Sequence, residues 1–206
     1  MTPRALLEAR GIVKSFGGRR ILGGLDLFVA DGARIGVLGP NGGGKSTLLR
    51  ILAGGETADA GTVTQRRGLV MAYLPQIVPG DERAAVATVL DARPELRETE
   101  AALAAVERRL ADTTDMREIE RALAQQERVL ERWTAMGGGG AEGDARAILR
   151  SLGLDDDDLD APTRRLSGGQ RKLVALAACL ARRPDVLLLD EPEAHLDMSR
   201  RSQLER

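Results

Sequence analysis

The chain has 206 residues and a formal net charge of −1, because 30 Lys and Arg residues nearly balance 31 Asp and Glu residues. This balance disfavours a protein that binds nucleic acid through bulk positive charge, although a local basic patch stays open, and four aromatic residues exclude rows of exposed rings for base stacking. A single cysteine, Cys179, excludes a disulfide framework and a thiolate zinc site.

No stretch approaches the roughly 18 apolar residues of a membrane span. The N-terminal sequence MTPRALLEAR reaches a charged residue before an apolar signal core can form. We therefore expect a cytoplasmic protein that does not insert into a membrane.

The first third of the chain has an α/β pattern. Residues 4–37 alternate apolar and polar positions around the turn Gly17-Gly18, which predicts antiparallel strands, and residues 35–38 predict a buried strand. After a glycine-rich loop, residues 46–54 predict a helix, and residues 61–74 return to strand-like alternation.

Residues 94–136 lack glycine, and Ala, Glu, Arg and Leu predominate in them. Apolar positions recur there at heptad-like spacing, namely Leu96, Leu103 and Leu110 and then, in steps of four and three, Ile119, Leu123, Gln126, Leu130 and Trp133. This spacing predicts two amphipathic helices that pack as an antiparallel hairpin, with two ordinary surface helices as the alternative. The glycines at 137–140 would end the second helix in a flexible joint.

The last third of the chain predicts helices at 145–152 and 169–183 and a fully apolar strand at 186–189. The acidic run 155–158 predicts a solvated loop. A metal site is the weaker alternative, because consecutive carboxylates point in different directions.

Residues 39–47 (GPNGGGKST) match the phosphate-binding pattern G-x-x-x-x-G-K-[ST] between a predicted strand and a predicted helix. The glycines let backbone N–H groups turn toward phosphate oxygens, and the helix N-terminus adds the positive end of its dipole. Lys45 would reach the β- and γ-phosphates, and the Ser46 hydroxyl would ligate Mg²⁺. The candidate nucleotide-binding residues are Gly39, Pro40, Asn41, Gly42, Gly43, Gly44, Lys45, Ser46 and Thr47. For this motif alone, a glycine-rich turn with a chance lysine is the alternative.

The apolar strand 186–189 ends in two carboxylates, Asp190 and Glu191. The carboxyl ends of parallel strands lie at the sheet edge where a phosphate loop also lies. Asp190 would hold Mg²⁺ through water, and Glu191 would polarise the water that attacks the γ-phosphate. Apolar strands that end in a charged turn are also common in unrelated proteins.

Residues 166–170 (LSGGQ) resemble the signature of the ATP-binding-cassette (ABC) ATPases. The Ser167 hydroxyl and the amides of Gly168 and Gly169 would form an anion site at a helix start, and Gln170 completes the motif. The resemblance implies that this signature caps the γ-phosphate bound to the phosphate loop of a second cassette, so that two cassettes enclose two ATP molecules.

Further elements of the family follow the expected order. Gln76 matches the glutamine loop that senses Mg²⁺ and the γ-phosphate, and Phe16 stands where the family stacks an aromatic ring on adenine. His195 and Asp197 match the loop after the acidic strand. The resemblance thus implies Glu191 and Gln76 as the catalytic residues, and Ser46, Gln76 and Asp190 as the Mg²⁺ site.

The resemblance implies an α/β fold, the P-loop NTPase fold of an ABC nucleotide-binding domain. An antiparallel β subdomain and a helical subdomain, with residues 94–136 as an inserted helical-hairpin arm, would complete it. We expect residues 1–206 to form one such domain, incomplete at its C-terminus, because the family's switch histidine lies beyond residue 197 and His195 does not match it. Such a chain alone would bind ATP and hydrolyse it weakly or not at all.

Within the family, residues 166–176 and 188–197 resemble the first cassette of the ABC-F group, which acts on ribosomes and carries an arm where this chain has residues 94–136. The implied function is ATP hydrolysis in translation or in ribosome protection against antibiotics. The implied partners are a second cassette, the large ribosomal subunit and tRNA. Seven Arg against ten Asp and Glu in residues 94–136 count against RNA contact by the hairpin, except through clustered arginines such as Arg108-Arg109.

Two other functions stay open. The first is the ATP-binding subunit of an ABC transporter, and the second is a cassette used in DNA repair or as a non-catalytic scaffold.

Overall fold

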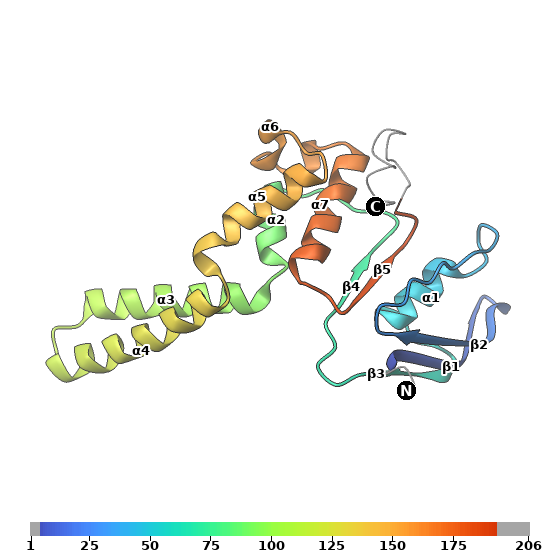
Figure 1. Ribbon diagram of the computed structural model, residues 1–206, viewed down its shortest axis with the longest axis horizontal. Helices are drawn as coiled ribbons and strands as arrows, with labels where there is room; N and C mark the ends of the chain where they lie inside the picture. The colour runs from blue at the N-terminus through green and yellow to red at the C-terminus, as the bar shows by residue number, and fades with distance from the viewer. Residues whose placement is uncertain (1–4, 193–206) are drawn as a thin grey trace. The chain divides into compact units, whose positions relative to one another are not determined.

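The computed structural model describes residues 5–192, which belong to two compact units. The first unit comprises Met1–Pro79 and Arg182–Arg206, of which 5–79 and 182–192 are described, and the second comprises Gly80–Ala181. Figure 1 labels the elements of both units, and each unit is described below by itself.

The first unit begins with an antiparallel sheet of three strands. It contains β1 (Ala5–Phe16), β2 (Arg19–Ala30) and β3 (Ala60–Gln65) in the order β2-β1-β3. The turn between β1 and β2 consists of Gly17 and Gly18 with φ of 54° and 79°. Positive φ at both central residues is the geometry of a type I′ hairpin, so the predicted turn is confirmed.

A two-stranded parallel sheet and one helix complete the first unit. Strand β4 (Met71–Leu74) pairs with β5 (Val186–Leu189), and helix α1 (Lys45–Leu52) follows the glycine-rich loop. These elements share one aliphatic core. Its buried members are Leu6, Leu7, Ala9, Ile12, Leu22, Leu48, Leu49, Ile51, Leu52, Val186 and Leu188. The core therefore joins the phosphate loop's helix to the antiparallel sheet and to β5.

The strand predicted at residues 35–38 is wrong. These residues have no regular secondary structure, and Ile35 and Leu38 are 46% and 94% exposed. In the described part of the chain, the parallel sheet consists of β4 and β5, which pair with each other and provide no ladder for this segment. Gly36 and Gly39 also weaken an extended segment that lacks a partner.

The second unit is helical. Helices α2 (Ala85–Asp91), α5 (Ala141–Ser151) and α7 (Gly168–Ala181) pack against one another. The short helix α6 (Asp156–Leu159) and two 3-10 turns, Gly138–Gly140 and Thr163–Arg165, connect them. The predicted helix before Pro184 and the predicted strand at 186–189 are confirmed.

The acidic run was predicted to be a loop, but Asp156–Leu159 forms the helix α6. Acidic side chains in the first turn of a helix are stabilised by its dipole, which favours this conformation. Asp155, Asp156 and Asp157 are exposed, and Asp156 pairs with Arg150 at 2.6 Å.

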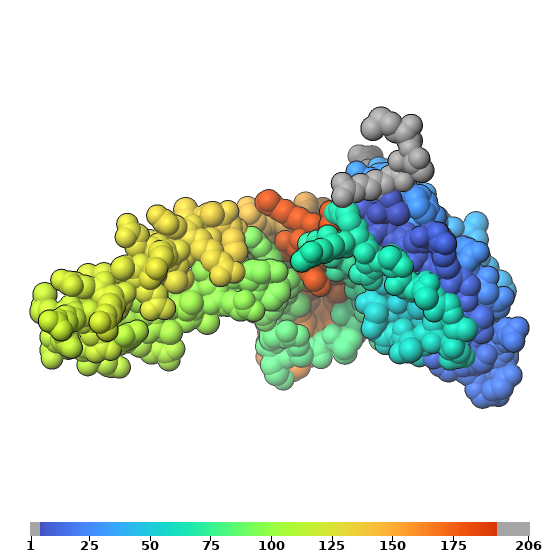
Figure 2. Space-filling model, turned by 90° about the horizontal axis from the view of Figure 1, so that it is seen from below, coloured from blue at the N-terminus to red at the C-terminus, as the bar shows by residue number. Residues whose placement is uncertain are grey.

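Helices α3 (Pro94–Asp112) and α4 (Met116–Ala135) pack along each other as a hairpin that extends from the rest of the second unit (Figure 1). Figure 2 shows the two helices side by side, in yellow-green and yellow. The Asp115 carboxylate caps α4 by accepting a 2.9 Å hydrogen bond from the Arg117 N–H, so the chain reverses at the predicted break.

The apolar positions predicted to form the buried seam of α4, the face that packs in the hairpin, have the correct helical period, but two of them are wrong. Ala122 is fully buried, whereas Leu123 and Leu130 are 50% and 48% exposed. The buried face of α4 therefore passes through Ala122, one position before Leu123.

None of the helices within residues 5–192 combines the length and the apolar character that crossing a membrane requires.

A candidate nucleotide-binding site

The glycine-rich loop turns directly into α1, as the motif requires. Gly44 is the last residue before α1 and has φ of 92°, a left-handed conformation that glycine adopts without strain. A Cβ on Gly44 would lie 2.6 Å from Ile21 Cγ2 on β2. The loop is therefore packed against the start of β2. Position 44 requires a residue that tolerates a left-handed backbone and has no Cβ, and glycine meets both requirements.

Lys45 and Thr47 lie in the first turn of α1. The Lys45 ammonium donates to the carbonyl oxygens of Gly39 and Pro40 at 3.0 and 3.1 Å, so it lies over the loop that precedes it. Thr47 is buried, whereas residues 39–43 are exposed. The backbone of the loop is accessible to an anion, with one cation beside it.

Asp190 joins this loop to the parallel sheet. Its backbone N–H donates to the Leu74 carbonyl at 3.0 Å, which extends the β4–β5 pairing by one residue. Its carboxylate is buried, and Oδ1 accepts a 2.9 Å hydrogen bond from the Ser46 hydroxyl. The structure thus brings together two residues that are 144 positions apart, as the sequence predicts for a site at this sheet edge.

Tyr73, on the neighbouring strand, contacts Asp190 and was not among the residues that the sequence predicted for the site. Its hydroxyl donates to Asp190 Oδ2 at 3.2 Å. Burial, and secondarily the nearby Asp190 carboxylate, raises the pKa of Tyr73 to about 12. The phenol is therefore protonated at physiological pH and acts as a hydrogen-bond donor.

Gln76 and Glu191 meet just beyond the ends of β4 and β5. The Gln76 Nε2 amide donates to Glu191 Oε2 at 2.6 Å. Glu191 has φ of 46°, which is rare for a residue other than glycine and is a common form of backbone strain at functional sites. Both side chains are exposed, so this carboxylate can reach a water molecule.

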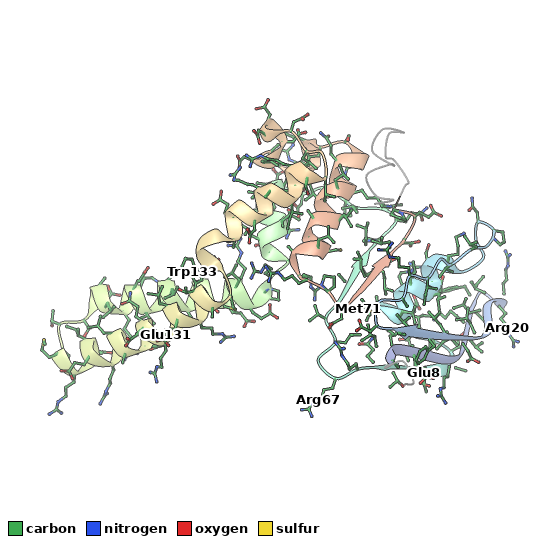
Figure 3. All side chains as sticks on the ribbon, in the orientation of Figure 1. Glu8, Arg20, Arg67, Met71, Glu131 and Trp133 are labelled. Carbon is green, nitrogen blue, oxygen red and sulfur yellow. The ribbon has the colours of Figure 1, made fainter. Side chains whose placement is uncertain are left out.

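Phe16 lies at the end of β1, next to the β1–β2 turn, with 46% of its surface exposed. The Lys14 ammonium lies 5.1 Å from the centroid of its ring, in the range of a cation–π contact. The loop packs against Ile21 near the start of β2, so the hairpin that carries Phe16 adjoins the phosphate loop. Figure 3 marks Arg20 on this hairpin and Met71 at the start of β4.

The signature residues lie in the second unit and form a helix cap. The Ser167 hydroxyl accepts from the Gln170 N–H at 3.2 Å, and Gln170 Oε1 accepts from the Ser167 N–H at 2.8 Å. This reciprocal pair is a capping box at the start of α7. Gln170 Nε2 also donates to Asp158, and these bonds leave the Gly168 and Gly169 amides at an exposed helix N-terminus. His195 and Asp197 lie outside the described residues.

The donors in the first unit fit Mg²⁺. The Ser46 hydroxyl and the Asp190 carboxylate offer the hard oxygen ligands that Mg²⁺ prefers, and the ion is commonly bound by one or two carboxylates together with substrate phosphates. No cluster of three or more His, Cys, Asp or Glu side chains suited to a metal occurs within residues 5–192. A hydroxyl and a single carboxylate are a donor set of the kind that binds Mg²⁺ together with substrate phosphates.

Comparisons with known proteins agree on the family. The chain is 40% identical over 197 residues to the tylosin resistance ATP-binding protein TlrC of Streptomyces fradiae, with 95% of this chain and 36% of that protein covered. It is 37% identical over 189 residues to the energy-dependent translational throttle protein EttA of Haemophilus influenzae, with 91% and 33% covered. It is 36% identical over 203 residues to the aliphatic sulfonates import ATP-binding protein SsuB of Mycobacterium sp. strain MCS, with 98% and 66% covered.

The chain thus spans about a third of the length of TlrC. Its fold is similar to that of a nucleotide-free ATP-binding cassette from an ABC transporter, with a TM-score of 0.62, 23% identity, and 98% of this chain and 74% of that chain covered. The profile of the ABC transporter family matches residues 22–194. With the phosphate loop, the acidic strand and the signature in family order, this match shows that the chain is an ATP-binding cassette and belongs to the ABC transporter family.

Proposed function

We propose that the chain binds Mg²⁺·ATP at the phosphate loop and supplies one half of an ATP-hydrolysing cassette pair. The observation that carries this proposal is the Ser46–Asp190 hydrogen bond at 2.9 Å beside the Gln76–Glu191 hydrogen bond at 2.6 Å. These two contacts place a candidate metal-binding pair, Ser46 and Asp190, at the same sheet edge as Glu191, a carboxylate that could accept a proton from water. Residues 1–206 would form one ABC domain with residues 94–136 as its inserted arm.

Each site residue has a defined task in this proposal. The loop amides of residues 39–44 and the Lys45 ammonium bind the phosphates, and Phe16 stacks on adenine. Ser46, Asp190 and Gln76 would hold Mg²⁺, which would neutralise charge on the phosphates. Glu191 accepts a proton from the water whose oxygen attacks the γ-phosphorus, while the bond to the bridging oxygen breaks and ADP leaves. In the second unit, residues 167–170 cap the nucleotide of a second cassette.

Substitution of two residues separates binding from hydrolysis. Lys45→Ala removes the cation of the loop and should weaken ATP binding strongly. Glu191→Gln keeps the hydrogen-bonding shape of the side chain but cannot accept the proton, so it should bind ATP normally and slow hydrolysis in the full-length gene product. A Glu191→Gln protein that hydrolyses ATP at the parent rate would show that Glu191 is not the base.

We further propose that the cassette acts on the ribosome in the cytoplasm, as a translation factor or in ribosome protection against antibiotics. The large ribosomal subunit and tRNA would be its partners. The names of two relatives, a tylosin resistance protein and a translational throttle protein, support this assignment. The α3–α4 hairpin supports it independently, because it offers an elongated surface beyond the rest of the second unit.

Although acidic residues outnumber arginines in the hairpin, four of its arginines lie together on one face of α4. Arg117, Arg121, Arg128 and Arg132 follow one another at steps of four, seven and four residues, which places them on one face of α4, away from the buried Ala122. Figure 3 shows nitrogen-tipped side chains that extend from α4 on the side away from α3. All four are exposed, and none pairs with a carboxylate within residues 5–192. Like charges four residues apart destabilise a helix, so a phosphate partner would relieve this cost.

Pelleting of the Glu191→Gln protein with ribosomes and ATP tests the ribosome assignment. We expect ATP-dependent pelleting, and a large loss when the four α4 arginines are changed to Gln. A matched variant changes four arginines that pair with carboxylates in the same unit to Gln and should pellet like the parent. These four are Arg83, Arg97, Arg146 and Arg150. Absence of ATP-dependent pelleting would contradict the assignment.

A transporter subunit is the second candidate, because the similarity to the import ATP-binding protein SsuB covers 66% of the length of that protein. Co-purification of the tagged chain with an integral membrane protein encoded beside its gene, without ribosomes, would favour this function.

A further inference from the structure

The hydroxyl of Tyr73 extends the candidate Mg²⁺ site by one residue. In the parallel register of β4 and β5, Tyr73 lies opposite Leu188, and Asp190 follows Leu188 by two positions. Since side chains alternate along a strand, Tyr73 and Asp190 lie on the same face of this pair. Asp190 Oδ1 accepts a hydrogen bond from Ser46 at 2.9 Å, and Oδ2 accepts a hydrogen bond from Tyr73 at 3.2 Å.

The two donors differ in what they can do when a metal is bound. Ser46 is a candidate ligand, and its hydroxyl oxygen is then shared with the ion. Tyr73 contacts the other oxygen of the carboxylate and is not a candidate ligand. Groups that hydrogen-bond to a metal ligand fix its orientation and adjust its strength as a ligand.

We propose that Tyr73 is a positioning residue that holds the Asp190 carboxylate in the orientation required for Mg²⁺·ATP. This inference rests on the proposed function of the phosphate loop. The ring of Tyr73 packs against the core of the first unit, so it also holds its own hydroxyl in place. Tyr73→Phe keeps this packing and removes one hydroxyl group, which separates positioning from folding.

The test measures metal binding as well as nucleotide binding. The affinity for a fluorescent ATP analogue is measured in EDTA and over a Mg²⁺ titration, and bound Mn²⁺ is counted from the loss of the free-ion electron paramagnetic resonance signal. For Tyr73→Phe we expect unchanged affinity in EDTA and a Mg²⁺ or Mn²⁺ requirement raised about tenfold, the lower end for loss of a group that orients a metal ligand. Thr64→Val, which removes a hydroxyl from β3 outside the site, should behave like the parent.

Three outcomes distinguish the two proposals. A Tyr73→Phe chain with the parent's metal requirement overturns the positioning role of Tyr73 and leaves the nucleotide site intact. If affinity falls equally in EDTA and in Mg²⁺, Tyr73 supports the fold of the loop, and the positioning role is again overturned. If Lys45→Ala binds nucleotide like the parent, the nucleotide site itself is wrong, and the inference fails with it.

Discussion

Two adjacent residues of α4 test how α3 and α4 pack. Heptad spacing puts Leu123 in the seam, whereas the structure buries Ala122 completely and leaves Leu123 50% exposed. Full burial of a leucine contributes about 1.5–3 kcal/mol, so half burial gives about 1 kcal/mol as the cost of Leu123→Ala. Ala122→Leu adds a bulky group at a fully buried position and should cost about 1–3 kcal/mol.

Urea unfolding followed by tryptophan fluorescence measures both variants. Trp133 is the only tryptophan of the chain and lies near the end of α4 (Figure 3), so its signal reports on the hairpin. Leu130→Ala serves as the matched control and should resemble Leu123→Ala, because Leu130 is 48% exposed. Intrinsic helix propensity contributes little, since alanine and leucine are both good helix formers.

The opposite ranking would refute this packing. If Leu123 occupied the seam, its replacement by alanine would leave a cavity and cost about 2–5 kcal/mol. Ala122→Leu would then fall on the surface and change stability little.

Three further predictions concern other parts of the chain. Gly44→Ala places a Cβ on a residue with a left-handed backbone, 2.6 Å from Ile21, so nucleotide affinity measured by fluorescence titration should fall at least about tenfold. The control Gly36→Ala, whose Cβ would have no atom within 4 Å, should bind nucleotide like the parent. Gln170→Ala breaks the capping box of α7 and should cost about 1 kcal/mol in thermal unfolding followed by circular dichroism; an unchanged melting temperature would contradict the cap. Hydrogen bonds from Arg83 lower the pKa of Asp81 to about 2, so its contribution to stability is present above its ordinary pKa near 4 and disappears as pH falls through 2. Urea unfolding at several pH values should therefore show Asp81→Asn less stable than the parent at pH 6 and equal to it below pH 2.

The phosphate loop, the acidic strand and the signature could be predicted because their patterns are local. A glycine is required at position 44 by backbone conformation, and the apolar run 186–189 is a strand that finds its partner in β4. Residues 35–38 have the same apolar character, but a strand also needs a partner, and the sequence does not say which segments pair.

The proposed role of Tyr73 depends on a strand register that no local sequence pattern contains. Once β4 and β5 are known to pair at Tyr73 and Leu188, the alternation of side chains is sufficient to bring Tyr73 to Asp190. Likewise, the period of α4 follows from its sequence, but the face that it buries, which includes Ala122, depends on how the two helices pack.

The long connection between β4 and β5 has a consequence for the order of folding. Tyr73 and Asp190 are 117 positions apart, and the entire second unit is synthesised between them. Domains fold as units during synthesis, from the N-terminus onward, whereas long-range parallel pairing is slow because it must close a long loop. The helical second unit can therefore fold on the nascent chain while β4 still lacks its partner. The Ser46–Asp190 bond can then form only after the helical unit has been synthesised, so the candidate metal-binding pair is completed later than the fold of that unit.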